Sequence, residues 1–526
     1  MKCFILPLAI LGAFIAPPLL MWRIRKRQHR AGAPSPRLVD LTRDRGVPLE
    51  MEPDLEKRLG LWYEEEAGED NGPMSSRDVT QGDALEELAG EEASSPSTAT
   101  SGDSQKESVI EGDGQGPGSP GFPLGKDDIH VVFSSDCTSY QAWQAVVLFH
   151  SAILSGHLAP ITQLVSGCDE ESKAAMIHRH EITKHSETHK LYFTESFSVS
   201  NPVTGEDYPY MNKPNAMLRW INDNSIEIPE TVIALIDPDF LFLKPLTPFL
   251  DPQETVVKGD GLSLEGLKLE GGAWVREGHP AGQRFALPNW VHWDRTKFCP
   301  KDTMCASGAF RWWAKRYYDL IPPYLAHKED WRRILPHWVD QAPKVFQIYS
   351  SLLAEQTAYA TACATLDLKH YRINSYAIEN EKVDYELWDA VDFNMENVCD
   401  VGIEPGDSAG VDIRSFTMRP NFIHYCHMYR VGQWLFNKRR YRKEFKYDQL
   451  SCEALLEIPP LEIQKSHFKI HPGSRYESIT PRAAKRNAFM MCVATRFVNS
   501  ALRRFKEKMC TTPEHRANFN QTVRIS

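Results

Sequence analysis

Two carboxylates separated by one residue stand in the middle of an otherwise apolar segment. The small and apolar run 231–236 leads into Asp237-Pro238-Asp239, and the apolar run 240–243 follows. Two like charges this close need a cation to be tolerated. Carboxylate oxygens suit Mg²⁺ or Mn²⁺, which often connect a protein to substrate phosphates. The alternative is a turn with two solvated acids, because Asp and Pro are ordinary turn residues.

The segments around the acid pair predict the sheet that would position it. A short apolar run bounded by turn residues is typical of a strand buried on both faces, as in parallel α/β sheets. Ligands bind outside the carboxyl ends of such strands. In an extended chain, side chains at i and i+2 point the same way, so Asp237 and Asp239 are expected to face one site. The runs 129–133 and 159–165 predict two further strands.

Helices are expected between and after these strands. The spacing of apolar residues predicts a helix over 140–154, and Asn212-Lys213-Pro214 opens another, since Pro suits the first turn. The segment 355–366 is strongly helical in composition. The sequence therefore predicts an α/β domain over 128–450, followed by a basic helical extension over 451–526. We expect its segment 478–510 to be an amphipathic helix that packs on the domain or contacts anionic lipid.

Composition sets the two ends of the chain apart. The chain has 526 residues, a net charge of −10 and 42% hydrophobic residues, enough for a large core. Residues 31–127 are acidic and rich in Gly, Ser and Pro, which predicts a disordered stem. Residues 1–30 predict a membrane anchor with a basic flank, because a span needs about 20 apolar residues. Nothing in the composition indicates nucleic-acid binding.

The cysteines and one sequon are compatible with a secretory compartment. Ten cysteines lie beyond the anchor, an even number that fits disulfides, although their spacing does not reveal the pairing. Asn520 begins an N-glycosylation sequon, Asn-Gln-Thr. The basic run 23–27 follows the apolar segment, and the positive-inside rule would keep that side cytoplasmic.

Several motifs, in the same order along the chain, resemble a known family of enzymes. They are similar to peptidyl hydroxyproline O-arabinosyltransferases and the related peptidyl serine α-galactosyltransferases, over about residues 129–445. The motifs are Val132-Phe133-Ser134-Ser135-Asp136-Cys137, Asn212-Lys213-Pro214 with Trp220, Asp237-Pro238-Asp239 with Lys244-Pro245, the helix around Glu355 and Tyr359, Phe422-Ile423-His424-Tyr425, and 432–439.

The resemblance implies a GT-A-like mixed sheet that binds a nucleotide sugar and is flanked by helices. It implies a metal-dependent, retaining transfer of arabinose or galactose from a UDP-sugar to a hydroxyl of hydroxyproline or serine in secreted or cell-wall glycoproteins. Pro238 resembles the arabinosyltransferases and Asp136-Cys137 the galactosyltransferases, so donor and acceptor stay open. The layout is similar to Golgi type II glycosyltransferases, which implies a single-pass Golgi or ER membrane protein with a lumenal catalytic domain. That orientation rests on the enzyme class.

The resemblance also implies a metal and donor site. Asp237 and Asp239 would hold Mn²⁺ (or Mg²⁺) and the diphosphate, with His424 as the third metal ligand. The alternative for His424 is a hydrogen-bonded core histidine.

Four further side chains would contact the nucleotide. Ser134 and Asp136 would bind uridine or ribose hydroxyls. Lys213, and Lys438 or Arg439, would neutralise the phosphates, and a solvated basic face is the alternative for these cations.

Glu355 is the remaining candidate catalytic residue beside Asp237 and Asp239. A covalent retaining route needs a carboxylate nucleophile, whereas a front-face route needs none. Glu355 could equally be an acid on a helix surface. At the level of the whole protein, the alternatives are an inactive sugar-nucleotide-binding or scaffolding protein of the same fold and a metal-dependent phosphohydrolase.

Overall fold

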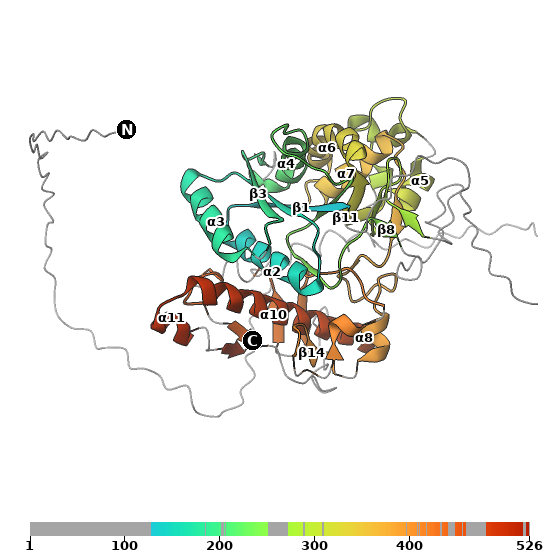
Figure 1. Ribbon diagram of the computed structural model, residues 1–526. Coiled ribbons are helices and arrows are strands. Elements are labelled where there is room, and N and C mark those ends of the chain that lie inside the picture. Colours follow the sequence, from blue (N-terminus) through green and yellow to red (C-terminus); the bar gives the residue numbers. More distant parts are fainter. Residues whose placement is uncertain are drawn as a thin grey trace, which may run out of the picture. The chain divides into compact units, whose positions relative to one another are not determined.

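The largest sheet of the protein is mixed and has seven strands, as seen in a computed structural model (Figure 1). The structure describes residues 128–184, 186–200, 205, 207–250, 272–287, 290–307, 310–395, 397–407, 409, 411–416, 418–431, 434–439, 448–454, 456–458, 480–518 and 522–524. The strand order is β12-β10-β11-β6-β1-β2-β3. The bounds are β1 Ile129–Asp136, β2 Ile161–Ser166, β3 His189–Thr194, β6 Val232–Ile236, β10 Ala281–Arg284, β11 Leu320–His327 and β12 Tyr371–Ile373.

The strand before the acid pair is buried as predicted, but its surroundings are only partly parallel. All five residues of β6 are fully buried. β6 runs parallel to β1 and antiparallel to β11. The two neighbours of β6 therefore run in opposite directions, because β11 enters next to β6 antiparallel to it. The mixed α/β sheet is confirmed.

Helices cover both faces of this sheet. On one face, α4 contacts β1 and β2, and α6 and α7 pack together over β11; on the other, α2 contacts β1 (Figure 1). The helices predicted over 140–154 and 355–366 are confirmed within one residue at each end, and a helix begins at Asn212 as predicted. The bounds are α2 Ser139–Ser155, α3 Glu170–Thr183, α4 Asn212–Ile221, α5 Phe310–Tyr317, α6 Lys328–Ile348, α7 Ala354–Thr365 and α8 Asp389–Asn394.

A second, three-stranded sheet lies beside α2 and positions the candidate site. Its order is β13-β16-β7, with bounds β7 Phe240–Phe242, β13 Ala377–Ile378 and β16 Phe422–His424. β16 is antiparallel to β7 and parallel to β13. The chain thus leaves the large sheet at Ile236, turns through Asp237-Pro238-Asp239 and enters the small sheet at Phe240.

The amphipathic helix expected near the carboxyl end is present as α10, Pro481–Met509. Its apolar residues Phe489, Val493, Phe497 and Leu502 are buried in a core shared with α2 and the small sheet. α10 contacts α2, β17 and α8, and Figure 1 shows it running along α2. The apolar face of α10 is therefore covered by protein.

The remaining described elements are short. The strands are β4 Val199–Ser200, β5 Asp207–Tyr208, β8 Phe249–Leu250, β9 Ala273–Trp274, β14 Val401–Gly402, β15 Val411–Asp412, β17 Met428–Val431, β18 Trp434–Asn437, β19 Leu456–Ile458 and β20 Thr522–Arg524. The helices are η2 Pro209–Met211, η4 Trp290–His292, η5 Arg295–Lys297, η6 Met304–Ala306, η7 Ile413–Ser415 and α11 Pro513–Asn518.

Four disulfides connect eight of the cysteines. The pairs are Cys137–Cys168, Cys299–Cys305, Cys399–Cys492 and Cys452–Cys510. The first joins the segments that follow β1 and β2, and the third ties α10 to the loop before β14. Cys363 and Cys426 are free.

The predicted anchor (1–30), the predicted stem (31–127) and the sequon residue Asn520 lie outside the described residues. Within the part of the chain that the structure describes, no helix has both the length and the apolar character needed to cross a bilayer.

Candidate functional site

The acid pair lies in a tight turn between two strands of different sheets. Asp237 and Asp239 flank Pro238 between β6 and β7, so the residues are not part of one extended strand as expected. The turn, rather than the pleat of a strand, brings the two side chains together. Asp239 is buried and Asp237 is mostly buried, so the alternative of a solvated turn was also wrong.

His424 reaches the acid pair from the end of β16. Its position follows from strand pairing, because β16 is antiparallel to β7 and places His424 opposite Phe240, the residue after Asp239. The imidazole stacks on the Phe240 ring, and its Nε2 lies 3.4 Å from Asp239 Oδ2. The candidate ligand atoms of Asp237, Asp239 and His424 all lie within 4.8 Å of one another.

This donor set fits a hard divalent cation. Two carboxylates and one imidazole offer oxygen and nitrogen ligands, and Mg²⁺ and Mn²⁺ commonly take one or two carboxylates together with substrate phosphates. Binding of a cation by Asp237, Asp239 and His424 stays a prediction, because a buried histidine between acids is also consistent with the geometry.

Each acid of the pair forms an ion pair with a buried lysine. Lys213 Nζ lies 2.8 Å from Asp237 Oδ1, and Lys438 Nζ donates to Asp239 Oδ2. Burial opposes ionisation of Asp239, but the charges of Lys438 and His424 hold the pKa of its carboxyl well below the usual range. The alternative of a solvated basic face is therefore wrong for Lys213 and Lys438.

Lys213 also joins the acid pair to Glu355. It lies in the first turn of α4, where a cation is unfavourable because of the helix dipole. Burial would lower the pKa of Lys213, but the carboxylates of Asp237 and Glu355 raise it above its usual value. Lys213 Nζ lies 3.1 Å from Glu355 Oε2, so one ammonium group connects the two candidate catalytic acids.

Glu355 is a core residue rather than an acid on a helix surface. It lies in the first turn of α7 with 1% of its surface exposed. The Tyr208 hydroxyl accepts a hydrogen bond from its backbone N–H. Its Oε1 is buried and has no hydrogen-bond partner among the described residues. Burial raises the pKa of Glu355 to about 7, and the charge of Lys213 opposes this rise.

Ser134, Asp136 and Arg439 lie on segments that adjoin this cluster. Ser134 and Asp136 end β1, whose residue Phe133 pairs with Ile236 just before the acid turn. Asp136 Oδ1 accepts hydrogen bonds from the backbone and hydroxyl of Thr138 at the start of α2. No hydrogen bond within the described residues joins Ser134 or Asp136 to the acid pair. The backbone N–H of Arg439 donates to Asn437 Oδ1.

The sequence did not indicate Glu379, which contacts His424 directly. Glu379 follows β13 and is buried, and its Oε2 accepts from His424 Nδ1. Such a carboxylate fixes the tautomer of a histidine, leaving Nε2 available to a metal. The Tyr429 hydroxyl lies 3.1 Å from the carbonyl oxygens of both Glu379 and His424. The signal that could have found Glu379 is the acid that follows the short apolar pair Ala377-Ile378.

Comparisons with known proteins agree with the family that the motifs resemble. Residues 129–258 match the model of the hydroxyproline O-arabinosyltransferase family N-terminal domain. A peptidyl serine alpha-galactosyltransferase of Arabidopsis thaliana is 35% identical over 121 residues, which are 23% of this chain and 14% of that protein. The matched part thus spans about one seventh of the relative's length.

A solved structure gives a weaker likeness. The crystal structure of the galactosyltransferase LgtC, in complex with donor and acceptor sugar analogues, aligns over 57% of this chain and 87% of its own. The TM-score is 0.31 and the sequence identity 12%, too low to support an inference. The family match confirms the resemblance read from the motifs within residues 129–258, and the relative agrees with it over 121 residues.

Proposed function

We propose that the protein is a metal-dependent, retaining glycosyltransferase, a proposal supported by the match of residues 129–258 to the hydroxyproline O-arabinosyltransferase family N-terminal domain. It moves arabinose or galactose from a UDP-sugar to a hydroxyl of hydroxyproline or serine in secreted or cell-wall glycoproteins. The architecture proposed for it is GT-A-like, with the donor bound at the edge of the large sheet where β1 and β6 end.

The observation that supports this proposal is the charge of the buried cluster. Three carboxyl groups, those of Asp237, Asp239 and Glu355, contact two ammonium groups, those of Lys213 and Lys438. A fourth carboxyl group, that of Glu379, contacts the imidazole of His424. Buried charges are costly unless they are paired. An acid excess at the end of a strand is the charge pattern that a divalent cation would neutralise.

Several residues of this chain would stabilise the departing diphosphate, each in a different way. Mn²⁺ or Mg²⁺ held by Asp237, Asp239 and His424 would neutralise charge on the departing diphosphate. Lys213 and Lys438 lie against the same acids and would stabilise the phosphate oxygens as bond cleavage progresses. Glu379 would hold His424 in one tautomer.

Glu355 is the carboxylate proposed to act near the sugar. Its Oε2 is held by Lys213, and its unpaired Oε1 would accept a hydrogen bond from a donor-sugar hydroxyl or approach the anomeric carbon. A buried acid with a pKa of about 7 is partly ionised near neutral pH, so both forms are accessible to the reaction.

We place the reaction in the lumen of the Golgi or ER, with the protein held by a single anchor at its amino end. The disulfides support this placement, because such bonds form and persist in oxidising compartments. The acceptor would be a secreted peptide or glycoprotein, and no nucleic acid is involved.

A screen of donors against acceptors tests the proposal. Full-length protein is incubated with UDP-arabinofuranose, UDP-galactose or UDP-glucose, Mn²⁺, and matched peptides that contain hydroxyproline or serine. We expect one donor to give a glycopeptide with the mass of one added sugar, and EDTA to abolish the product until Mn²⁺ is restored. NMR of the product reports whether the anomeric configuration is retained.

Two results would contradict the proposal. Metal-dependent UDP-sugar binding without transfer or donor hydrolysis would identify an inactive binding protein. Release of phosphate without sugar transfer would identify a phosphohydrolase.

A further inference from the structure

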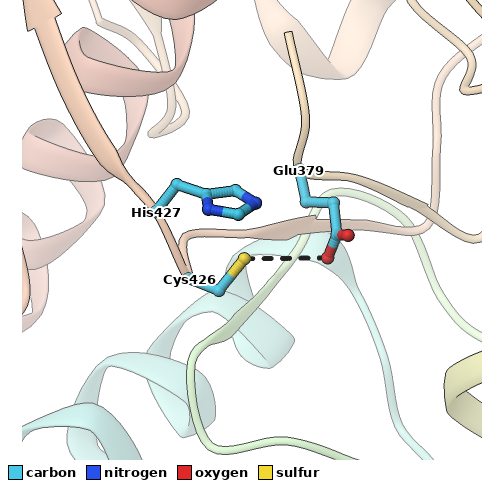
Figure 2. A group of neighbouring side chains, drawn as sticks. All are labelled: Glu379, Cys426 and His427. Atoms are coloured by element: carbon cyan, nitrogen blue, oxygen red, sulfur yellow. Dashed lines mark hydrogen bonds between the residues drawn. The ribbon is translucent and has the colours of Figure 1, made fainter. Parts of the chain in front are cut away.

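A second group of metal-ligating side chains lies beside the candidate donor site. Glu379, Cys426 and His427, here called the thiol cluster, offer a carboxylate oxygen, a sulfur and an imidazole nitrogen that all lie within 4.8 Å of one another. Figure 2 shows the three side chains converging from two segments, with Cys426 Sγ in contact with Glu379 Oε2 at 3.7 Å.

The small sheet brings these two segments together. β13 and β16 are parallel neighbours, with Ile378 paired to Ile423, so the residues that follow both strands emerge on the same side. Glu379 follows β13 directly, and Cys426 and His427 lie between β16 and β17. Glu379 is buried, whereas Cys426 and His427 are partly exposed.

We propose that the thiol cluster is a metal site for a borderline or soft divalent cation of the Zn²⁺ class, separate from the hard-cation site of Asp237, Asp239 and His424. The inference does not depend on the proposed glycosyltransferase activity.

The donor types distinguish the two sites. A thiolate and an imidazole are preferred by Zn²⁺, whereas carboxylate oxygens suit Mg²⁺ and Mn²⁺. Only the thiol cluster contains sulfur, and only the acid pair contributes two carboxylates from one turn. The same protein can therefore sort two kinds of cation by ligand chemistry.

The separations within the thiol cluster are close to what Zn²⁺ requires. Zn–S, Zn–N and Zn–O bonds of about 2.0 to 2.3 Å imply ligand atoms roughly 3.3 to 3.8 Å apart in a tetrahedron. The limit of 4.8 Å in the thiol cluster is about 1 Å longer, a difference that side-chain rotation can remove. Three protein ligands with partial exposure leave the fourth position to water.

The disulfide pattern leaves the Cys426 thiol available as a metal ligand. Eight of the ten described cysteines are paired, and the two free ones are Cys363 and Cys426. Cys363 is fully buried in α7, 3.9 Å from His370. Cys426 is partly exposed and has both a histidine and a carboxylate beside it, so of the two free thiols only Cys426 belongs to a group of three potential ligands among the described residues.

Glu379 connects the two sites. Its Oε2 accepts from His424 Nδ1, and the same oxygen contacts Cys426 Sγ. A cation in the thiol cluster would therefore bind next to the carboxylate that orients His424. The consequence is that Zn²⁺ in the thiol cluster alters the affinity of the neighbouring site for Mn²⁺.

The test measures metal directly in the full-length protein. The protein is stripped with chelator, equilibrated with Zn²⁺ alone, desalted and analysed by elemental mass spectrometry. We expect about one Zn²⁺ per chain, lost in Cys426→Ser and in His427→Gln. Two matched controls should retain it: Cys363→Ser, which removes the other free thiol, and Asp237→Asn, which alters the hard-cation site.

Cobalt gives a second readout that does not depend on stoichiometry. Co²⁺ bound by a thiolate shows a sulfur-to-metal charge-transfer band in the near ultraviolet, and this band should be absent in Cys426→Ser and present in Cys363→Ser. Circular dichroism confirms that each variant is folded.

Three results would overturn the inference. They are absence of Zn²⁺ from the wild-type protein, retention of Zn²⁺ by folded Cys426→Ser, and loss of Zn²⁺ in Asp237→Asn but not in Cys426→Ser. The last result would mean that Zn²⁺ merely enters the hard-cation site. None of these measurements involves sugar transfer, so failure here leaves the proposed function untouched.

Discussion

Two buried groups of charged side chains differ in how completely their polar atoms are paired. The first, here called the arginine clamp, joins Arg486 of α10 to Asp392 of α8. Arg486 Nε and Nη2 bond to the two oxygens of Asp392 at 3.0 and 2.7 Å, and Nη1 donates to the carbonyls of Glu381 and Val383. Arg482 adds a second cation to the same carboxylate.

The second group is the candidate site, and it is not closed in this way. Lys213 is shared between Asp237 and Glu355, and Lys438 pairs with Asp239. Carboxylates outnumber lysines, and Glu355 Oε1 has no hydrogen-bond partner among the described residues. In the arginine clamp each side-chain nitrogen of Arg486 has a hydrogen-bond partner, so no donor of Arg486 requires a ligand.

This difference distinguishes buried charges that stabilise the fold from buried charges that bind a ligand. A bidentate Arg–carboxylate pair with satisfied donors fixes geometry and has no capacity left for a ligand. A cluster with surplus acid and an unpaired oxygen is less stable by itself and gains from a bound cation or substrate. Substitutions in the arginine clamp should therefore affect folding, and those in the site should affect binding and turnover.

The largest expected effect is on turnover. Asp239→Asn keeps the shape of the side chain and an oxygen for Lys438 but removes one charge from the metal site. We expect kcat/KM to fall about a thousandfold or more, with Mn²⁺ and UDP binding lost in calorimetry. Asp340→Asn, on the exposed face of α6, is the matched control, because the ion pair of Asp340 within the described part of the chain is with Lys344 alone.

Normal turnover in Asp239→Asn would contradict the functional role assigned to the candidate site and its distinction from the arginine clamp. A loss of turnover equal to that of Asp340→Asn would do the same.

The next effect is on stability. Arg486→Ala leaves the Asp392 carboxylate buried with only Arg482 as partner, and removal of one member of a buried pair costs about 3 kcal/mol. Thermal unfolding should occur at a lower temperature, while the activity per folded molecule is unchanged. Arg482→Ala is the control, because Arg482 is half exposed and its contribution should be below about 1 kcal/mol.

An unchanged unfolding temperature for Arg486→Ala would show that the bidentate pair is not what holds α10 to α8. The interpretation of the arginine clamp as structural would then be wrong.

A smaller effect is expected one contact away from the acid pair. Glu379→Gln keeps an acceptor for His424 Nδ1 but removes the charge, and loss of such a supporting carboxylate weakens metal binding about 10- to 100-fold. Calorimetric titration with Mn²⁺ measures this. Glu381→Gln, a nearby buried acid without a described side-chain contact to His424, should bind Mn²⁺ as the wild type does.

Equal Mn²⁺ affinity in Glu379→Gln and wild type would show that the orientation of His424 does not depend on Glu379. It would leave the acid pair as the sole determinant of the metal site.

How much of this could be predicted from the sequence depends on the distance between partners along the chain. The strand before Asp237 and the helix beginning near Glu355 were predictable, because their signals lie in consecutive residues. The pairing of Lys438 with Asp239 spans 199 residues and depends on a small sheet of two- and three-residue strands. Strands that short carry almost no periodicity, so the contact between Glu379 and His424 was not predictable.

Burial was the other property that local sequence did not reveal. Glu355 has the position of an ordinary acid in the first turn of a helix, which favours a surface role. Only the packing of α7 against α6 and the reach of Lys213 from α4 place it in the core. The disulfide pairs were open for the same reason, since cysteine spacing does not determine connectivity.

The last expected effect is a pH dependence of stability, and it tests whether the site has surplus acid at all. The pKa of Glu355 is raised to about 7 by burial, so the folded state binds this proton more tightly than the unfolded state. Its contribution to stability is therefore full below the unfolded pKa and is lost as the pH rises through about 7. We expect the free energy of unfolding of the wild type, relative to Glu355→Gln, to fall by up to about 1.4 kcal/mol per pH unit between about pH 5 and 7.

Denaturant unfolding of both proteins across this pH range, followed by tryptophan fluorescence, measures the difference. Glu329→Gln, at a partly exposed acid in the first turn of α6, is the matched control. A difference independent of pH would mean that Lys213 keeps Glu355 ionised throughout the range. Lys213 would then be fully engaged by two acids, the site would be as closed as the arginine clamp, and the case for a bound cation would rest on Asp239 and His424 alone.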